Sequence, residues 1–213
     1  MSLTRTAEEN LQMIRSLMER ATIYRAVSVP AAFWGGGLSL AAFLGHLALE
    51  RNHQAVGAAG FLALWLGVLA LAVAGNAVLL LKEARHAGTR FPHPSFKMAF
   101  RGLFPAFLIA AVFTAMGQWQ APATQAAIWI LFYGLGLLGT WHFAPRSLIL
   151  LGWLFVGSAL AWFFWAKCHV PYPSDDAALT GSGLMALTFG GYHLIYAAAV
   201  RALSASSRFT SSE

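Results

Sequence analysis

Long apolar runs separated by short polar stretches dominate the hydropathy pattern of this chain. Six of these runs are long enough to cross about 30 Å of hydrocarbon, which takes roughly 20 helical residues. They cover residues 27–49, 55–81, 98–117, 124–143, 147–166 and 179–200. The pattern predicts an all-α fold, a polytopic membrane helix bundle with six transmembrane helices over residues 27–201. Residues 202–213 are expected to form a disordered C-terminal tail.

An amphipathic segment precedes the first apolar run. In "TAEENLQMIRSLMER", Leu11, Ile14 and Met18 recur at helical spacing, with charged residues between them. Thr6, followed three residues later by a glutamate, fits a capping box at the start of a helix. We therefore predict an N-terminal amphipathic helix within residues 1–26, cytoplasmic or interfacial. It would lie on the membrane surface or beneath the bundle, or dock on a partner, and the sequence leaves these alternatives open.

The composition places the chain in a lipid bilayer. With 58% hydrophobic and 10% charged residues, it has more apolar side chains than one soluble core of 213 residues can bury. Its one cysteine, Cys168, allows no intrachain disulfide and no paired-cysteine metal or redox motif.

The basic residues are distributed very unequally between the two ends of the predicted helices. Lysine and arginine near short loops stay preferentially on the cytoplasmic side. If the N-terminus is cytoplasmic, that side carries twelve of the fourteen, and only Arg51 and Lys167 are external. The cytoplasmic set is Arg5, Arg15, Arg20, Arg25, Lys82, Arg85, Arg90, Lys97, Arg101, Arg146, Arg201 and Arg208. This predicts a multi-pass protein of the inner (cytoplasmic) membrane with both termini cytoplasmic.

We interpret the net charge of +6 as part of the same membrane-topology signal. Basic side chains near the cytoplasmic surface would contact anionic lipid headgroups, each contributing about 1 kcal/mol. The basic residues are scattered over loops without a recognition motif, so we expect no nucleic-acid partner.

Small residues at four-residue intervals mark helix faces that can pack closely in a bilayer. These are Ala31, Gly35 and Ser39 in the first run and Ser182, Ala186 and Gly190 in the last. At 100° per residue, His46 lies within about 20° of Gly35. His193 lies within about 20° of Ser182 around the axis of the last helix. Both histidines should therefore face neighbouring helices.

A set of polar residues falls in the cytoplasmic half of the predicted spans, around the last intramembrane histidine. The set is Asn76, Arg101, Tyr192, His193 and Tyr196. Intramembrane polar residues usually face the bundle interior or a cavity, which makes these a candidate binding or proton-handling site. The alternative is a structural hydrogen-bond network. His86 and His93 do not have a metal-ligand spacing, and we predict no metal site.

Two segments carry a resemblance to a known family. "LQMIRSLMERA" near the N-terminus and "FGGYHLIY" in the last span resemble an uncharacterised family of small bacterial polytopic membrane proteins. That family has a charged IRxxME-type helix before several spans and an HxxY pattern in the last one. The resemblance implies a bacterial membrane protein and assigns neither an activity nor a functional residue.

Enzymatic chemistry is not indicated by the sequence. No acidic residue lies inside a predicted span, and HExxH and GxSxG motifs are missing, so we predict no enzyme and no cofactor. The first expectation is a non-catalytic regulatory or scaffolding membrane protein. The alternative is a small oligomeric transporter or hydrophobic-ligand-binding bundle that uses the polar cluster. A cavity at the level of His193 would favour the alternative, and a tightly packed interior would favour the first expectation.

Overall fold

A computed structural model describes residues 29–86, 88, 94–116, 121–142, 144–169 and 177–209 of the chain. Every regular element among them is a helix. The elements are α2 (Val29–Arg51), α3 (Ala58–His86), α4 (Pro94–Ala115), α5 (Pro122–Leu138), α6 (Arg146–His169), α7 (Ala177–Met185), the π-helical η2 (Ala186–Tyr192) and α8 (His193–Phe209). The prediction of an all-α bundle is confirmed. The amphipathic helix predicted within residues 1–26 lies outside the described residues.

Four helices of the described chain are long and apolar enough to cross a membrane. They are Val29–Arg51, Ala58–His86, Arg146–Cys168 and the continuous last helix Ala177–Ala202, which joins α7, η2 and α8. The apolar parts of α4 and α5 are shorter, Phe100–Ala115 and Pro122–Leu138. Each of the six predicted runs thus coincides with a helix, and four of the six meet the length and hydropathy expected of a membrane span.

Two helix ends differ from the sequence-based boundaries. α5 ends at Leu138, before the expected end at residue 143, because the N–H groups of Thr140 and Trp141 bond to carbonyls three residues back, not four, in a closing turn. α8 continues to Phe209, into the segment that we expected to be a disordered tail. Its sequence "RALSASSRF" contains no proline or glycine, so nothing interrupts the helix there.

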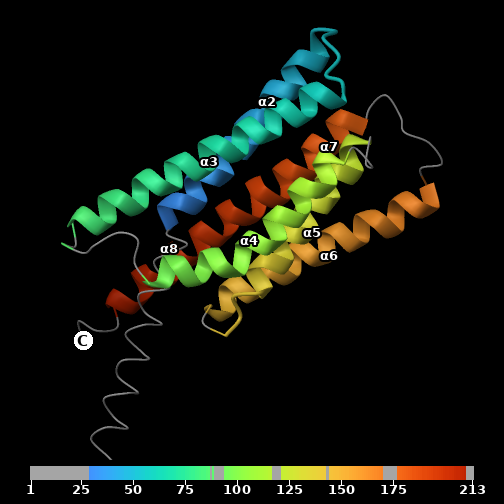
Figure 1. Cartoon of the computed structure of the whole chain (residues 1–213). Coiled ribbons are helices and arrows are strands. Elements are labelled where there is room, and N and C mark those ends of the chain that lie inside the picture. Colours follow the sequence, from blue (N-terminus) through green and yellow to red (C-terminus); the bar gives the residue numbers. More distant parts are fainter. Residues whose placement is uncertain are drawn as a thin grey trace, which may run out of the picture.

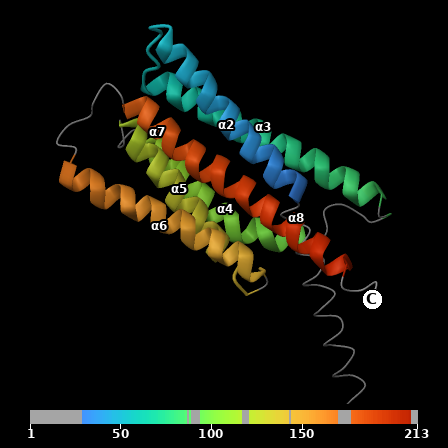
Figure 2. The ribbon, with the colours of Figure 1, turned by 180° about the vertical axis from the view of Figure 1, so that it is seen from behind.

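The last helix runs between two groups of helices (Figure 1). α2 and α3 form an antiparallel pair on one side, and α4, α5 and α6 lie on the other, as the reverse view also shows (Figure 2). α5 packs against α4, α6 and α7, whereas α2 packs against α3 and the last helix. α3 has α2 as its main neighbour and only limited contact with α5 and α7.

Small residues bring α2 and η2 close together. A Cβ atom added to Gly36 would lie 3.1 Å from the carbonyl oxygen of Gly190, so only glycine allows this approach without a shift. The predicted small-residue face of the last helix is confirmed, since Ser182 and Gly190 are buried. On α2 the prediction is wrong by one position: Gly36 makes the contact, whereas Gly35 has open space beside it. The buried residues Ala32, Gly36 and Ser39 follow the 3.6-residue turn more closely than a fixed four-residue interval does.

α7 crosses the N-terminal end of α5 at an equally short distance. A Cβ atom on Gly181 would lie 2.9 Å from both the carbonyl carbon and the oxygen of Pro122. These are backbone atoms, which cannot move aside as the end of a side chain can. The position of Gly181 therefore fixes how closely α5 and α7 approach each other.

Gly181→Ala is expected to destabilise the protein by about 1–3 kcal/mol, because the added methyl group overpacks a backbone contact. Gly183→Ala is the matched control on the same helix. Its Cβ would lie 3.8 Å from Phe43 Cε2, an ordinary contact, so the higher helix propensity of alanine should leave stability unchanged or raise it by up to about 1 kcal/mol. Thermal unfolding of the purified variants in detergent measures both effects. Equal melting temperatures for the two variants would contradict the close contact at Gly181.

Candidate functional site

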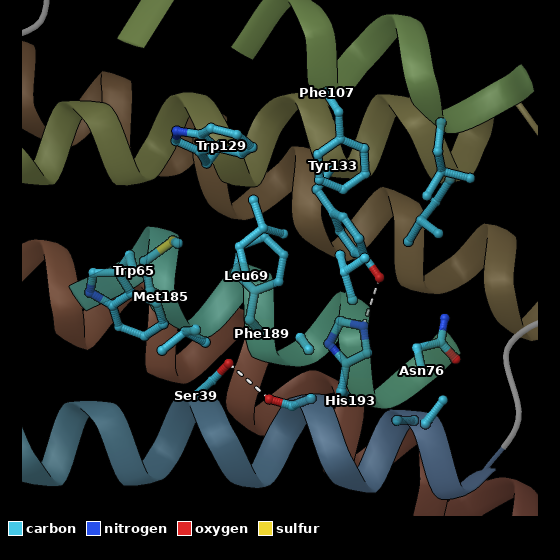
Figure 3. A pocket seen from close by; sticks show the side chains of 18 of the residues that line it. Ser39, Trp65, Leu69, Asn76, Phe107, Trp129, Tyr133, Met185, Phe189 and His193 are labelled. Atoms are coloured by element: carbon cyan, nitrogen blue, oxygen red, sulfur yellow. Dashed lines mark hydrogen bonds between the residues drawn. The ribbon is translucent and has the colours of Figure 1, made fainter. Parts of the chain in front are cut away.

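A cavity of about 560 Å³ lies between α3 on one side and α4 and α5 on the other. α2 and the last helix form its floor, with Ser39 and His193 among the lining residues (Figure 3). Aromatic rings contribute much of the wall: Trp65 from α3, Phe107 from α4, and Trp129 from α5. The volume falls within the range of small-molecule binding pockets, about 300–1,000 Å³.

The cavity is elongated along the helices. Phe61 and Leu80 both line it, and they are nineteen residues apart on α3. At 1.5 Å per residue, this separation corresponds to roughly 28 Å. That length is comparable to the hydrocarbon thickness of a bilayer, about 30 Å.

The cavity opens to the outside between α3 and α4. Val73 on α3 and Phe104 on α4 both line the cavity, yet their side chains are 60% and 49% exposed. Within the described part of the chain, α3 and α4 make little or no direct contact. The exposed residues on both edges are apolar, so the opening suits the lipid phase better than water.

His193 reaches the cavity from the first position of α8. Its side chain is 9% exposed, and its Nε2 lies 2.7 Å from the hydroxyl of Tyr133 on α5 (Figure 3). The imidazole stacks on Phe189, with ring centroids 6.2 Å apart and planes inclined by 9°. Phe189 belongs to η2, and π-helical segments frequently occur at functional sites.

The hydrogen-bond partners of His193 favour one proton arrangement. If Tyr133 donates to Nε2, the ring hydrogen resides on Nδ1. The reverse arrangement would leave the Nδ1 lone pair facing the carbonyl oxygens of Phe189 and Thr188, which are acceptors themselves. Nδ1 is buried and makes no hydrogen bond of good geometry there, although the carbonyls of Phe189 and Thr188 are near the ring. The arrangement with fewer unpaired groups therefore places an N–H donor at Nδ1.

The structure brings together three of the five polar residues singled out from the sequence. Asn76, His193 and Tyr196 all line the cavity, and Asn76 Oδ1 is a buried acceptor without a hydrogen-bond partner. Arg101 is exposed and does not line the cavity. Tyr192 does not line it either, since its hydroxyl lies 2.7 Å from Ser158 Oγ on α6.

Sequence reasoning missed Tyr133, the direct partner of His193. The signal was present, because Tyr133 lies within the fourth apolar run, in "LFYGLG". A tyrosine there has a hydroxyl that requires a partner in an apolar environment. Nothing in the local sequence, however, indicates that this partner is a histidine 60 residues later in the chain.

A second polar group, centred on Ser182 beside the cavity, connects three helices. The Ser182 hydroxyl on α7 accepts a hydrogen bond of 2.9 Å from the indole N–H of Trp65 on α3. The same oxygen lies 2.7 Å from Nδ1 of His46 on α2. His46 is 1% exposed, so the prediction that it faces neighbouring helices is confirmed.

His46 and Ser182, together with Glu50, resemble a nucleophile, base and carboxylate arrangement. Nε2 of His46 lies 3.4 Å from Glu50 Oε1, without an aligned hydrogen bond. The same carboxylate oxygen accepts a 3.0 Å bond from the N–H of Val56 in the α2–α3 loop. Ser182 is 0% exposed and its oxygen already accepts the Trp65 N–H, so a substrate cannot reach it. The geometry therefore supports a role in holding α2, α3 and α7 together.

Other observations do not assign a function to the cavity. Among the residues that the structure describes, no three His, Cys, Asp or Glu side chains gather as metal ligands would. No protein family, curated protein or solved structure matches this chain in sequence or fold comparisons. The function is therefore argued from the geometry of the cavity itself.

Ser182→Ala is expected to destabilise the protein by about 1–3 kcal/mol, because it leaves two buried ring nitrogens without their partner. Ser39→Ala is the matched control, since the Ser39 hydroxyl is also buried but bonds only to the Gly35 carbonyl of its own helix. We expect that change to stay below about 0.5 kcal/mol. Thermal unfolding of both variants measures the difference. Equal effects would show that the Ser182 hydroxyl does not hold the three helices together.

Proposed function

We propose that this protein is an integral membrane protein that binds a hydrophobic molecule in the cavity between α3 and the α4–α5 pair. The observation that carries the proposal is an elongated apolar cavity of about 560 Å³ that contains His193 and opens between two helices. A cavity at this level favours the ligand-binding class over a regulatory or scaffolding protein. The scaffolding expectation depends mainly on residues 1–26, which lie outside the described part of the chain.

In a bilayer the cavity could hold water, stay empty or hold a hydrophobic molecule. An apolar cavity of this size does not hold water well, because water needs two to four polar partners. If it were empty, its lining side chains would lose dispersion contacts on one side. A hydrocarbon chain that moves in between Val73 and Phe104 would restore those contacts. Lateral access from the lipid phase is therefore the simplest route for a ligand.

The membrane setting completes the proposal. We propose six spans, with α4 and α5 completing the bundle, in the inner membrane of a bacterium. In the described chain, Lys82 and Arg85 at the end of α3 and Arg201 on α8 support a cytoplasmic location for this end of the bundle. The last turn of α3 and the C-terminal part of α8 lie toward the same end of the molecule (Figure 1).

The proposed orientation predicts the outcome of reporter fusions. Fusions after residues 52 and 174 should report an external location, and a fusion after residue 90 should report a cytoplasmic one. The reason is that twelve of the fourteen basic residues would then be cytoplasmic. Alkaline phosphatase and fluorescent-protein fusions at each site provide the measurement. A reversed pattern at all three sites would contradict the orientation.

Blocking the cavity should remove the bound molecule. Ala72 on α3 lines the cavity, and a tryptophan there would place a large side chain, with about 150–250 Å² of surface, in the ligand space. Ala72→Trp is expected to reduce the hydrophobic molecules that co-purify with the protein by at least about tenfold, equivalent to 1.4 kcal/mol of binding free energy. Native mass spectrometry of the protein released from detergent micelles measures this retention.

Ala74→Trp is the matched control. Ala74 is on the same helix, exposed, and not part of the cavity lining. This variant should therefore retain the same molecules as the wild type. If Ala72→Trp retains as much as Ala74→Trp and the wild type, the proposed binding function is wrong.

A further inference from the structure

One polar side chain that lines the cavity has no hydrogen-bond partner and remains accessible to a ligand. Gln125 is 8% exposed, and its side chain makes no hydrogen bond within the described part of the chain. Nδ1 of His193 and Oδ1 of Asn76 are also unpaired, but surrounding protein atoms cover both of them. Neither polar atom of the Gln125 amide is among these covered atoms. The amide therefore borders the cavity space.

The start of α5 fixes the position of this amide along the cavity. Gln125 lies in the first turn of α5, three residues after Pro122. A backbone contact with Gly181 holds this turn against α7. Trp65 bonds to the residue that follows Gly181, so it marks the same level on α3. Gln125 therefore lies toward the Trp65 end of the cavity, and Figure 3 shows Asn76 toward the opposite end.

The rest of the lining restricts the charge of the ligand. The described lining contains no Asp, Glu, Lys or Arg. A charged group placed there would lose its hydration without gaining an ion-pair partner, which is unfavourable in an apolar environment. A buried amide without a partner is also costly, and polar side chains of membrane helices commonly bond across to other helices. An uncharged polar group on the ligand removes this cost without introducing another.

The chemistry of a primary amide determines which uncharged group fits best. The Gln125 side chain has two N–H donors and one carbonyl acceptor. A hydroxyl or an amide on the ligand can accept a hydrogen bond from the NH₂ group and donate one to the carbonyl. An ester or a ketone can only accept, so it would leave the Gln125 carbonyl unpaired. Gln125 therefore favours a ligand group that both donates and accepts.

We infer that the cavity binds an uncharged lipid whose polar group is a hydroxyl or an amide, and that Gln125 binds this group. The hydrocarbon tail extends from Gln125 past His193 toward Leu80, along the apolar lining. In the proposed orientation α5 begins at the external surface, so the polar group lies near that surface and the tail points toward the cytoplasm. This inference rests on the proposed function and adds the polar group and the direction of the ligand to it.

Probes with one common hydrocarbon chain and different polar groups test the inference. Oleyl alcohol and oleamide carry a donor and an acceptor, methyl oleate carries only acceptors, oleate is charged, and octadecene has no polar group. Native mass spectrometry of the full-length protein in detergent gives the affinity of each probe relative to octadecene. We expect the wild type to bind oleyl alcohol or oleamide more tightly than methyl oleate, and oleate least tightly of the polar probes.

A shape-conserving variant identifies the residue that binds the polar group. Gln125→Met removes the donors and the acceptor, and it should lower the relative affinity for the preferred polar probe about tenfold, the effect of one satisfied polar group. Its melting temperature should match that of the wild type, because no hydrogen bond of the protein is lost. Gln54→Met is the matched control, since Gln54 is exposed in the α2–α3 loop and does not line the cavity. It should give the relative affinities of the wild type. Partitioning of a probe into the micelle is the same for all three proteins, so it cancels.

The outcomes separate this inference from the proposed function. If Gln125→Met and the wild type give equal relative affinities for oleyl alcohol and for oleamide, the inference is overturned while hydrophobic-ligand binding stands. The order of affinities in the wild type is a second test that needs no variant. Methyl oleate binding as tightly as oleyl alcohol and oleamide, or oleate binding most tightly, would overturn the inferred polar group. If none of the probes, octadecene included, binds the folded wild type, both the inference and the proposed function fail.

Discussion

The hydroxyl of Ser182 determines where the bundle is closed and where it stays open. Through Trp65 it holds one end of α3 against α7, and through His46 it holds α2 at the same level. Further along α3, the indole of Trp34 lies across Gly75 and donates a hydrogen bond of 3.1 Å to the Leu71 carbonyl. These contacts attach α3 to α2 and α7 but not to α4. The cavity is the space that remains beside α3.

Polar groups in an apolar environment divide into two classes in this structure. The hydroxyls of Ser182 and Tyr133 have partners on other helices, and they fix the arrangement of the bundle. Four buried atoms of the described chain have no such partner: Nδ1 of His193, Oδ1 of Asn76, Nε2 of His46 and Nε1 of Trp162. Because hydrophobicity alone does not drive helices together in a bilayer, paired groups and small residues supply specificity. The paired groups and the small residues therefore hold the helices around the cavity in their places.

Much of the fold could be predicted from the sequence, since each apolar run coincides with a helix. Hydropathy depends on the length and composition of a run, so it predicts that a helix is present but not the residue at which it ends. The turn at Gly139, which ends α5 early, is an example. Burial of His46 and His193 also followed from helical periodicity. The choice of Gly35 over Gly36 was wrong because a fixed four-residue interval drifts from the true helical turn.

The rest of the site could not be predicted, because it depends on contacts between distant segments. The pairing of Tyr133 with His193 and the π-helical turn that precedes His193 arise only when α5 and the last helix pack together. The separation of α3 from α4 depends on how three other helices hold α3. Arg101 lies in the N-terminal half of α4 but on an exposed side, so position along a helix alone does not place a residue in a cavity.

An experimental structure of the protein in lipid nanodiscs tests the central claim most directly. We expect elongated density between α3 and the α4–α5 pair that passes His193 and runs along the apolar wall. A structure in which α3 packs directly against α4, with no cavity beside His193 and no such density, would contradict it.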